Sequence, residues 1–313
     1  MHIALPENHL KHIVSTDQFT DLHLLKQLFQ ATDRLRRMPD VERLELLRHK
    51  LLATIFYEPS TRTRLSFETA MYRMGGQVIS SENADISSST TKGETIEDTI
   101  RTLGTYADII VLRHPEQGTA EKAAKASLIP VINAGDGAGE HPTQALLDLY
   151  TLLRHLGGSL NGKTIALVGD LLYGRTVHSL VKLLTLYENV RIILVSPPQL
   201  RMPPAYKHIG VTWEEVDNLT AVKEQVDALY VTRIQKERFQ NQATYKKLQQ
   251  NYVINKKTLK VLKSDGVIMH PLPRVGEIAT EVDADPRAMY FEQIQNGIFV
   301  RMALLYWLLA NKP

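Results

Sequence analysis

Short apolar runs alternate with stretches of helical periodicity along nearly the whole chain, and no other feature limits the possible folds as strongly. A strand–helix–strand order predicts parallel strands with helices covering both faces of the sheet. The largely apolar runs that we expect to form strands, two of them short, are residues 51–57, 78–79, 108–112, 130–133, 164–168, 190–195, 211–213, 228–231 and 266–269. The sequence therefore predicts an α/β protein built on parallel sheets.

The alternation is interrupted once, by the apolar helical stretch 146–156 and the glycine pair Gly157-Gly158. A length of 313 residues suits two domains. We therefore expect two doubly wound parallel-sheet (Rossmann-like) domains joined by helices, one spanning residues 1–140 and the other residues 141–293. The apolar helical segment 294–313 is expected to pack back on the first domain.

Composition excludes several classes of function. The chain has 37 Lys plus Arg against 34 Asp plus Glu, and this net charge of +3 is too small to indicate binding to nucleic acid or membranes. It has no cysteine, which excludes disulfides and thiolate metal sites and fits a cytoplasmic protein. Residues 1–10 carry no apolar signal region, and the apolar run 303–310 is too short to cross a bilayer. No H-E-x-x-H motif occurs, so we expect no metal.

The stretch Glu58–Arg64 places hydroxyl and guanidinium groups directly after an apolar run. Pro59 ends the expected strand and a helical pattern follows, so backbone N–H groups and the helix dipole should favour an anion here. The candidate phosphate ligands are Ser60, Thr61, Arg62 and Thr63. The simpler alternative is that Ser60 is an ordinary helix cap beside solvated arginines.

Polar side chains also follow two other expected strands of the first domain. Arg113 comes directly after residues 108–112, and the carboxyl ends of parallel strands face the ligand crevice, so we pair it with Thr63. His141 stands at an expected helix start, with Gln144 one turn further on the same face. A histidine near the positive end of a helix is favoured in its neutral form and can donate a hydrogen bond to a carbonyl oxygen.

The first strand of the second domain, residues 164–168, is followed by Gly169 and Gly174. These glycines lack the G-x-G-x-x-G spacing, and the expected acidic residue is also absent. We therefore expect no nicotinamide cofactor. Arg175 instead stands at a helix start, facing the crevice.

Two later strand ends of the second domain carry candidate ligands. Arg233 follows the apolar strand 228–231, and that strand argues against a merely solvated turn. After residues 266–269 two prolines fix the backbone and leave the carbonyls of Pro271 and Leu272 as hydrogen-bond acceptors.

Residues 80–92 are rich in serine and have almost no large side chains, so we expect a loop. The residues fit either a surface linker or a lid bearing Ser88 and Lys92. A second polar stretch, residues 239–250, is also expected to be a loop.

The Ser60–Arg64 turn, Ser-Thr-Arg-Thr-Arg, resembles the carbamoyltransferases that act on aspartate or ornithine. His141–Gln144, His-Pro-Thr-Gln, is similar to a second motif of that family, and the resemblance extends from Leu10 to Leu309. His270–Pro273, His-Pro-Leu-Pro, is similar to the branch that acts on aspartate. The ornithine branch typically has His-Cys-Leu-Pro and a Ser-Met-Gly stretch, and this chain has neither.

The resemblance implies a transferase of de novo pyrimidine biosynthesis. Such an enzyme transfers the carbamoyl group of carbamoyl phosphate to the amine of L-aspartate, giving N-carbamoyl-L-aspartate and phosphate. It implies a homotrimer with active sites at subunit interfaces and no cofactor, and some relatives also bind regulatory chains.

The resemblance also implies a role for each candidate residue. The groups implied to hold the phosphate are Ser60, Thr61, Arg62, Thr63 and Arg113, with Ser88 and Lys92 of a neighbouring subunit. Those implied to polarise the carbamoyl carbonyl are Thr63, Arg113 and His141. Those implied to orient the carbamoyl amide are Gln144 and the carbonyls of Pro271 and Leu272. Those implied to bind aspartate are Arg175, Arg233, Gln235 and Lys92.

Two alternatives stay open. An ornithine carbamoyltransferase shares the phosphate turn, although a pair of arginines suits a dianion better than a cationic diamino acid. The other alternative is a catalytically idle homologue that serves as a scaffold, although each matched catalytic position is filled.

Overall fold

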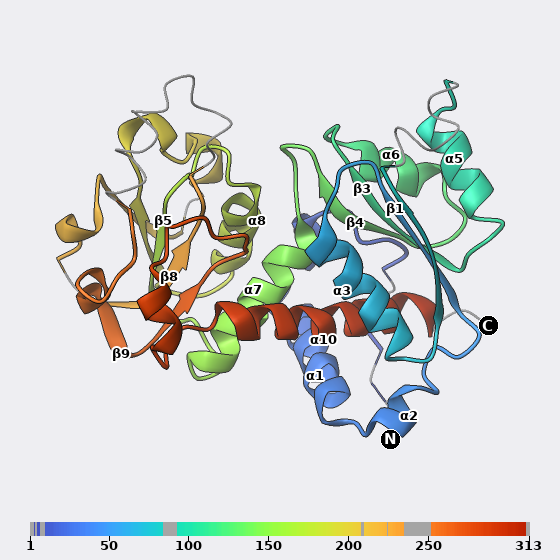
Figure 1. The fold of residues 1–313 in the computed structure, drawn as a ribbon, viewed down its shortest axis with the longest axis horizontal. Helices are drawn as coiled ribbons and strands as arrows, with labels where there is room; N and C mark the ends of the chain where they lie inside the picture. The colour runs from blue at the N-terminus through green and yellow to red at the C-terminus, as the bar shows by residue number, and fades with distance from the viewer. Residues whose placement is uncertain are drawn as a thin grey trace. The chain divides into compact units, whose positions relative to one another are not determined.

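The computed structural model describes residues 3, 5–6, 10–83, 93–207, 210–223, 225–234 and 252–310. The chain divides into two compact units, Met1–Leu146 with Asn296–Pro313, and Leu147–Gln295. Each unit is built on one parallel sheet flanked by helices (Figure 1), which confirms the predicted fold class. The helices α7 (Pro142–His155) and α10 (Tyr290–Leu309) run through the two junctions, so the units divide a few residues from the predicted boundaries.

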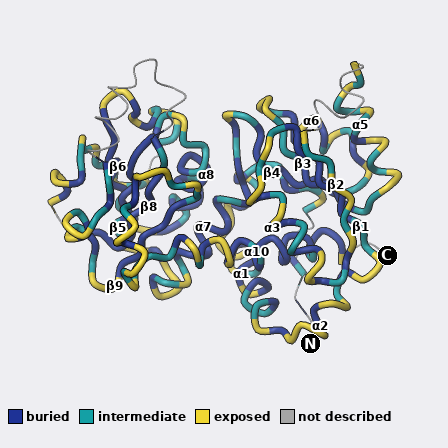
Figure 2. The backbone as a smooth tube through the Cα atoms, in the orientation of Figure 1, coloured by how far each residue is buried: buried dark blue, intermediate teal, exposed yellow. Residues whose placement is uncertain are grey.

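The first unit has a sheet of order β2-β1-β3-β4, and all its strand pairs are parallel. Its elements are η1 (Thr16–Phe19), α1 (Leu22–Arg37), α2 (Asp40–Arg43), β1 (Leu51–Phe56), α3 (Thr61–Tyr72), β2 (Gln77–Glu82), α5 (Ile96–Leu103), β3 (Ile109–His114), α6 (Thr119–Ala126) and β4 (Val131–Asp136). Alternate residues of β1, such as Ala53 and Ile55, pack with Ile100 of α5 and Ala123 of α6. The central strands are accordingly buried (Figure 2).

The second unit has a sheet of order β7-β6-β5-β8-β9, again with all pairs parallel. Its elements are β5 (Thr164–Val168), α8 (Arg175–Leu184), β6 (Arg191–Val195), η3 (Pro198–Leu200), η4 (Pro204–Tyr206), β7 (Thr212–Val216), η5 (Leu219–Ala221), β8 (Val226–Val231), η7 (Thr258–Val261), β9 (Leu262–Met269) and η8 (Thr280–Ala284). Apolar residues of β5, β6, β8 and β9 form one core with Tyr252, Ile254 and Tyr290.

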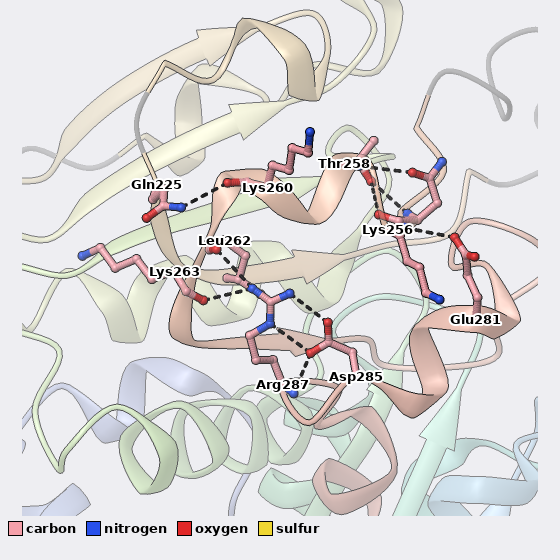
Figure 3. Close-up of polar contacts among 10 residues, drawn as sticks. Gln225, Lys256, Thr258, Lys260, Leu262, Lys263, Glu281, Asp285 and Arg287 are labelled. Carbon is pink, nitrogen blue, oxygen red and sulfur yellow. Dashed lines mark hydrogen bonds and ion pairs between the residues drawn. The ribbon is translucent and has the colours of Figure 1, made fainter.

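The start of β9 is fixed by Arg287, shown in Figure 3. Its guanidinium donates to both carboxylate oxygens of Asp285, at 2.9 and 2.8 Å. It also donates to the carbonyls of Leu262 and Lys263, each at 3.1 Å. Arg287 thus holds the end of the sheet at which β8 and β9 begin. The candidate ligands of this unit follow the other ends of the strands.

The apolar period of residues 16–38 by itself would favour a single helix, but the structure has two, η1 and α1, because the side chain of Asp21 accepts from the backbone N–H of His23 and starts α1. One local prediction also needs correction. Residues 80–82 of the expected loop instead belong to β2, which continues to Glu82, and residues 84–92 lie outside the described residues. The Ser80 hydroxyl lies within hydrogen-bond distance of Thr54 (2.9 Å) and Glu68 (2.7 Å), so Ser80 belongs to the sheet.

No helix in the described ranges is long and apolar enough to span a membrane. In the same ranges, no group of three or more His, Asp or Glu side chains could hold a metal ion.

Candidate functional site

The candidate ligands of the first unit follow three neighbouring strands. Because β1 pairs with β3 and β3 pairs with β4, all in parallel, their carboxyl ends meet at one edge of the sheet. Ser60–Thr63 follows β1, Arg113 lies near the end of β3, and His141 follows β4. The topology therefore brings the predicted phosphate and carbonyl groups to the same edge.

The turn after β1 has the predicted strand-to-helix form. Ser60 occupies the N-cap position of α3, but its side chain makes no capping hydrogen bond. Thr63 is buried at 7% exposure, whereas Thr61 and Arg62 are exposed. The structure thus does not support an ordinary cap at Ser60, and the binding of phosphate by this turn stays a prediction.

Arg64, the second guanidinium of the turn, is used structurally. It donates to Glu68 and to the Ser80 hydroxyl, each at 3.2 Å, and it pairs with Glu82 at 3.0 Å. These contacts tie α3 to the edge strand β2, so Arg64 is separate from the candidate phosphate ligands.

Arg113 lies beside the phosphate turn. Its Nη2 atom is 3.2 Å from the carboxylate of Glu58, and its Nη1 atom donates to the carbonyl of Ala134 at 3.1 Å. The Arg113 carbonyl accepts from the N–H of Tyr57, at 2.9 Å. Strand pairing and the ion pair together hold this guanidinium next to the start of the turn.

His114 contacts the segment that leads into α6 and packs against Tyr57. Its Nδ1 atom accepts from the backbone N–H of Glu116 at 3.1 Å and lies 3.1 Å from the Thr119 hydroxyl. Its ring meets Tyr57 edge-on, with centroids 4.7 Å apart, and burial lowers the pKa of His114. These residues border a pocket of about 170 Å³ that is lined by Tyr57, Glu94, Ile96, His114, Glu116, Thr119 and Lys122.

His141 is 5% exposed and directly precedes α7. Its carbonyl accepts from the N–H of Gln144, at 3.0 Å, and from that of Ala145, at 3.1 Å. Upstream, Asp136 accepts from the N–H groups of Glu140, at 2.8 Å, and Gly118, at 2.9 Å. The loop that carries His141 is thus fixed at both ends.

The sequence did not point to two residues that brace this unit. The first is Glu140, whose carboxylate accepts from the Ser15 hydroxyl at 3.0 Å and from the Thr16 N–H at 2.6 Å. These contacts tie the His141 loop to an N-terminal segment distant in the sequence.

The second is Arg301 of α10, which is 4% exposed. Its guanidinium donates to the hydroxyls of Ser66 in α3 (2.9 Å) and Thr143 in α7 (3.4 Å) and lies 5.0 Å from the Phe67 ring centroid. One buried cation therefore links the two helices whose starts carry the candidate ligands. Its apolar neighbours in the sequence gave no sign of this role.

In the second unit the ends of β5 and β8 lie close together. Gly169 has φ +116°, and a Cβ atom there would lie 2.3 Å from the carbonyl oxygen of Thr232. The Thr232 N–H donates to the carbonyl of Val168, at 2.7 Å. Glycine is therefore required at this contact, which brings the segments bearing Arg175 and Arg233 to neighbouring strand ends.

The turn after β9 presents the predicted carbonyls. Leu272 has φ +54°, a left-handed conformation that is unfavourable for leucine, and the Leu272–Pro273 bond is cis. In the described part of the chain, neither the Pro271 carbonyl nor the Leu272 carbonyl accepts a hydrogen bond. Because β8 pairs with β9, this turn lies at the same sheet edge as Arg233.

The other predicted ligands, Ser88, Lys92 and Gln235, lie outside the described residues, as does the stretch 239–250.

Comparison with known proteins decides the family. The family model for the aspartate/ornithine carbamoyltransferase carbamoyl-P binding domain matches residues 11–154, and the model for the Asp/Orn binding domain matches residues 161–308. The chain belongs to the aspartate/ornithine carbamoyltransferase family. Each of the two domain models matches the part of this carbamoyltransferase that contains one of its two sheets.

Similar proteins come from distant organisms. The chloroplastic aspartate carbamoyltransferase of Oryza sativa is 50% identical over 95% of this chain and 83% of its own. The catalytic subunit of M. jannaschii aspartate transcarbamoylase is 47% identical, with a TM-score of 0.90 over 97% of this chain and 99% of its own. Aspartate transcarbamoylase from Trypanosoma cruzi, solved with carbamoyl aspartate and phosphate, is 42% identical, with a TM-score of 0.89 over 98% of this chain and 100% of its own.

Proposed function

We propose that this carbamoyltransferase transfers the carbamoyl group of carbamoyl phosphate to the amine of L-aspartate, giving N-carbamoyl-L-aspartate and phosphate. The observation that carries the proposal is a pair of arginines in a chain of this family, Arg175 at the start of α8 and Arg233 just after β8. Two guanidiniums match the two carboxylates of aspartate, whereas ornithine carries a side-chain ammonium that they repel. The relative solved with carbamoyl aspartate supports the same substrate.

The first unit supplies the groups for carbamoyl phosphate. In the proposal, Ser60, Thr61, Arg62 and Thr63 hold the phosphate together with Arg113. Hydroxyls, backbone N–H groups at a helix start and guanidinium groups are the donors that phosphate favours. Gln144 and the carbonyls of Pro271 and Leu272 accept from the carbamoyl amide and orient it.

Catalysis needs no nucleophilic side chain, because the substrate amine attacks the carbamoyl carbon directly. A C–N bond forms, the C–O bond to phosphate breaks, and the amine proton passes to the leaving phosphate. Thr63, Arg113 and His141 stabilise the oxyanion of the tetrahedral intermediate. Orientation of the two substrates supplies most of the remaining rate enhancement.

We further propose a homotrimer whose active sites lie at subunit interfaces, with Ser88 and Lys92 reaching a neighbouring site and Gln235 joining the aspartate ligands. Pyrimidine biosynthesis, binding of regulatory chains and a cytoplasmic location also stay predictions.

A parallel assay tests the substrate. Purified protein is incubated with carbamoyl phosphate and either L-aspartate or L-ornithine, and the ureido product is measured by colour and mass. We expect product with aspartate alone. Citrulline formation would identify the ornithine enzyme, and no product with either amine, from folded protein, would favour the scaffold.

A further inference from the structure

A buried polar cluster in the second unit has no part in the proposed chemistry. Asp148 of α7 and Tyr230 of β8 are 0% exposed, and Gln293 of α10 is 1% exposed. The Tyr230 hydroxyl donates to one Asp148 oxygen at 2.6 Å, and the Gln293 amide donates to the other at 2.6 Å. Burial, together with the Asp148 carboxylate, raises the pKa of Tyr230 well above its ordinary value, so the phenol remains a donor. Both carboxylate oxygens are thereby satisfied, and the three side chains are fixed.

The cluster continues into the turn after β9. The Gln293 Oε1 atom accepts from the backbone N–H of His270, at 3.0 Å, while the Gln293 Nε2 atom donates to Asp148. Because one end of the amide must accept and the other must donate, the orientation of Gln293 is determined. A turned amide would place its oxygen against the Asp148 carboxylate and its NH2 group against the His270 N–H, so both hydrogen bonds would be lost.

His270 and Glu277 then hold the turn itself. The His270 Nδ1 atom accepts from the N–H of Leu272, at 2.8 Å, so its Nε2 atom carries the proton and donates to Glu277 at 2.7 Å. The second Glu277 oxygen accepts from the N–H of Val275, at 2.8 Å. Burial alone would raise the pKa of Glu277, but the hydrogen bonds from His270 and Val275 outweigh it, and the pKa is lowered.

These contacts explain why Leu272 keeps an unfavourable backbone conformation. A residue at φ +54° persists only where its surroundings impose that geometry. Here the Leu272 N–H is held by His270, which is held in turn by Glu277 and Gln293. The same contacts fix the direction of the Pro271 and Leu272 carbonyls.

The other end of the cluster reaches the aspartate-binding segments. Tyr230 forms a side-chain hydrogen bond with Thr176, the neighbour of Arg175. Tyr230 also lies near the end of β8, three residues before Arg233. The cluster therefore contacts the turn after β9 and the segment that carries Arg175. It also includes Tyr230, which lies on the strand that leads to Arg233.

We propose that Asp148, Gln293, His270 and Glu277 are positioning residues for carbamoyl transfer, which hold the Pro271 and Leu272 carbonyls in line with the carbamoyl amide. This inference rests on the proposed function. A buried polar network is weak support for stability, because apolar side chains of similar volume often serve equally well. Its directional hydrogen bonds can instead specify one backbone geometry.

Asp148→Asn tests the network without changing side-chain volume. If the introduced amide accepts from Tyr230 through its oxygen, its N–H groups face the amide of Gln293. Turning Gln293 to relieve this conflict moves the conflict to the His270 N–H. Misplaced substrate-orienting groups can cost on the order of 10²-fold. We expect kcat to fall by at least about tenfold, with KM for aspartate changed by less than about threefold.

Asp227→Asn is the matched control. Asp227 is, like Asp148, a buried carboxylate. It lies at the start of β8, whereas Tyr230 of the network lies near the end of the same strand. Asp227 accepts from the Thr164 N–H at 2.9 Å and pairs at 2.9 Å with Lys263, whose carbonyl accepts from Arg287 in Figure 3. Both variants should lower the melting temperature, but only Asp148→Asn should lower kcat.

A second readout does not depend on activity. Hydrogen–deuterium exchange is followed in the peptide covering residues 270–277, where the N–H groups of His270, Leu272 and Val275 are hydrogen-bonded. Exchange should be faster in Asp148→Asn and unchanged in Asp227→Asn. If the unmodified protein makes no carbamoyl aspartate, the proposed function fails, and the exchange comparison still decides whether the network holds the turn.

The double variant Asp148→Asn with Gln293→Glu restores the hydrogen bond between the two positions, with donor and acceptor exchanged. The new amide at position 148 donates to the new carboxylate at position 293, whose other oxygen accepts from His270. We expect recovery of kcat to within about threefold of the unmodified protein and recovery of slow exchange. If Asp148→Asn does not fold, Tyr230→Phe removes a single hydroxyl and should show the same pattern more weakly. Unchanged exchange in every folded network variant, or equal effects in Asp227→Asn, would overturn the inference.

Discussion

In the proposed function, two arginine side chains decide which amine this carbamoyltransferase accepts. Arg175 begins α8 and Arg233 follows β8, and the close contact of Gly169 with Thr232 brings these segments to neighbouring strand ends. A guanidinium binds a carboxylate through two parallel hydrogen bonds, which an ammonium group cannot reproduce. Specificity should therefore depend on the shape of the donor as well as its charge.

Arg233→Lys tests this at the residue scale. It keeps the charge but loses one charge-assisted hydrogen bond, so KM for aspartate should rise by about 10- to 100-fold, with little change for carbamoyl phosphate. Initial rates with each substrate varied in turn measure the two effects. Arg201→Lys, at an arginine paired with Asp217 on the surface, is the control and should behave as the unmodified protein. Equal effects on both substrates would remove Arg233 from the aspartate site.

His141→Ala tests the oxyanion role. Loss of one preorganised donor lowers kcat by on the order of 10²–10³-fold. Carbamoyl phosphate should still bind, as calorimetry can measure, because the Ser60–Thr63 turn is intact. The control is His23→Ala, at an exposed histidine of α1. Unchanged turnover would make His141 structural and leave the role to Thr63 and Arg113.

At the scale of elements, long-range polar contacts hold the segments that carry the ligands. Arg274 also holds the turn after β9. Its Nη2 atom donates to Asp283 at 2.5 Å, and its guanidinium lies 5.2 Å from the Tyr290 ring centroid. Asp283 also accepts from the Tyr290 hydroxyl. This side-chain cluster links the turn to the start of α10.

The Arg274–Asp283 contact predicts a pH dependence of stability. Hydrogen bonds from Arg274 and Tyr290 lower the pKa of Asp283 from 3.8 to about 2. A carboxyl group with a lowered pKa stabilises the fold above its unfolded pKa and loses that contribution as the pH falls, here between about pH 4 and pH 2. Urea midpoints measured across this range should fall less steeply for Asp283→Asn than for the unmodified protein. Asp265→Asn, at an exposed residue of β9, should keep the original slope, and an unchanged slope in Asp283→Asn would contradict the assignment.

At the scale of the whole molecule, the proposed trimer makes each active site a shared structure. If Lys92 serves the neighbouring site, Lys92→Ala and Arg113→Ala inactivate different halves of one interface. A trimer that contains both variants then has one site with both residues intact.

Mixing the two inactive variants tests this arrangement. After joint denaturation and refolding of equal amounts, about three trimers in four are hybrid, so activity should recover to about a quarter of the unmodified level. Each variant refolded alone is the control and should stay nearly inactive. If hybrids form, as sedimentation or native mass spectrometry can establish, and still show no activity above the parents, Lys92 acts in its own chain's site.

The sequence by itself determined the parallel α/β architecture and the strand ends at which polar residues gather. Strand–helix alternation is a local pattern, and in a parallel sheet local order fixes which ends meet, so Ser60–Thr63, Arg113 and His141 could be placed at one edge. The family resemblance, and not the spacing of residues, assigned their individual roles. Helix α6 gave little signal, because its buried face consists of the small side chains of Thr119, Ala120 and Ala123, which mark an apolar face only weakly.

Only the tertiary structure showed what holds those residues in place. Glu140 meets Ser15 across 125 residues, Gln293 meets Asp148 across 145, and Arg301 meets Ser66 across 235. No periodicity connects residues so far apart, because their meeting depends on how whole helices pack on the sheets. The physical reason is burial: a polar group removed from water must find a partner, and the packed fold decides which partner is within reach.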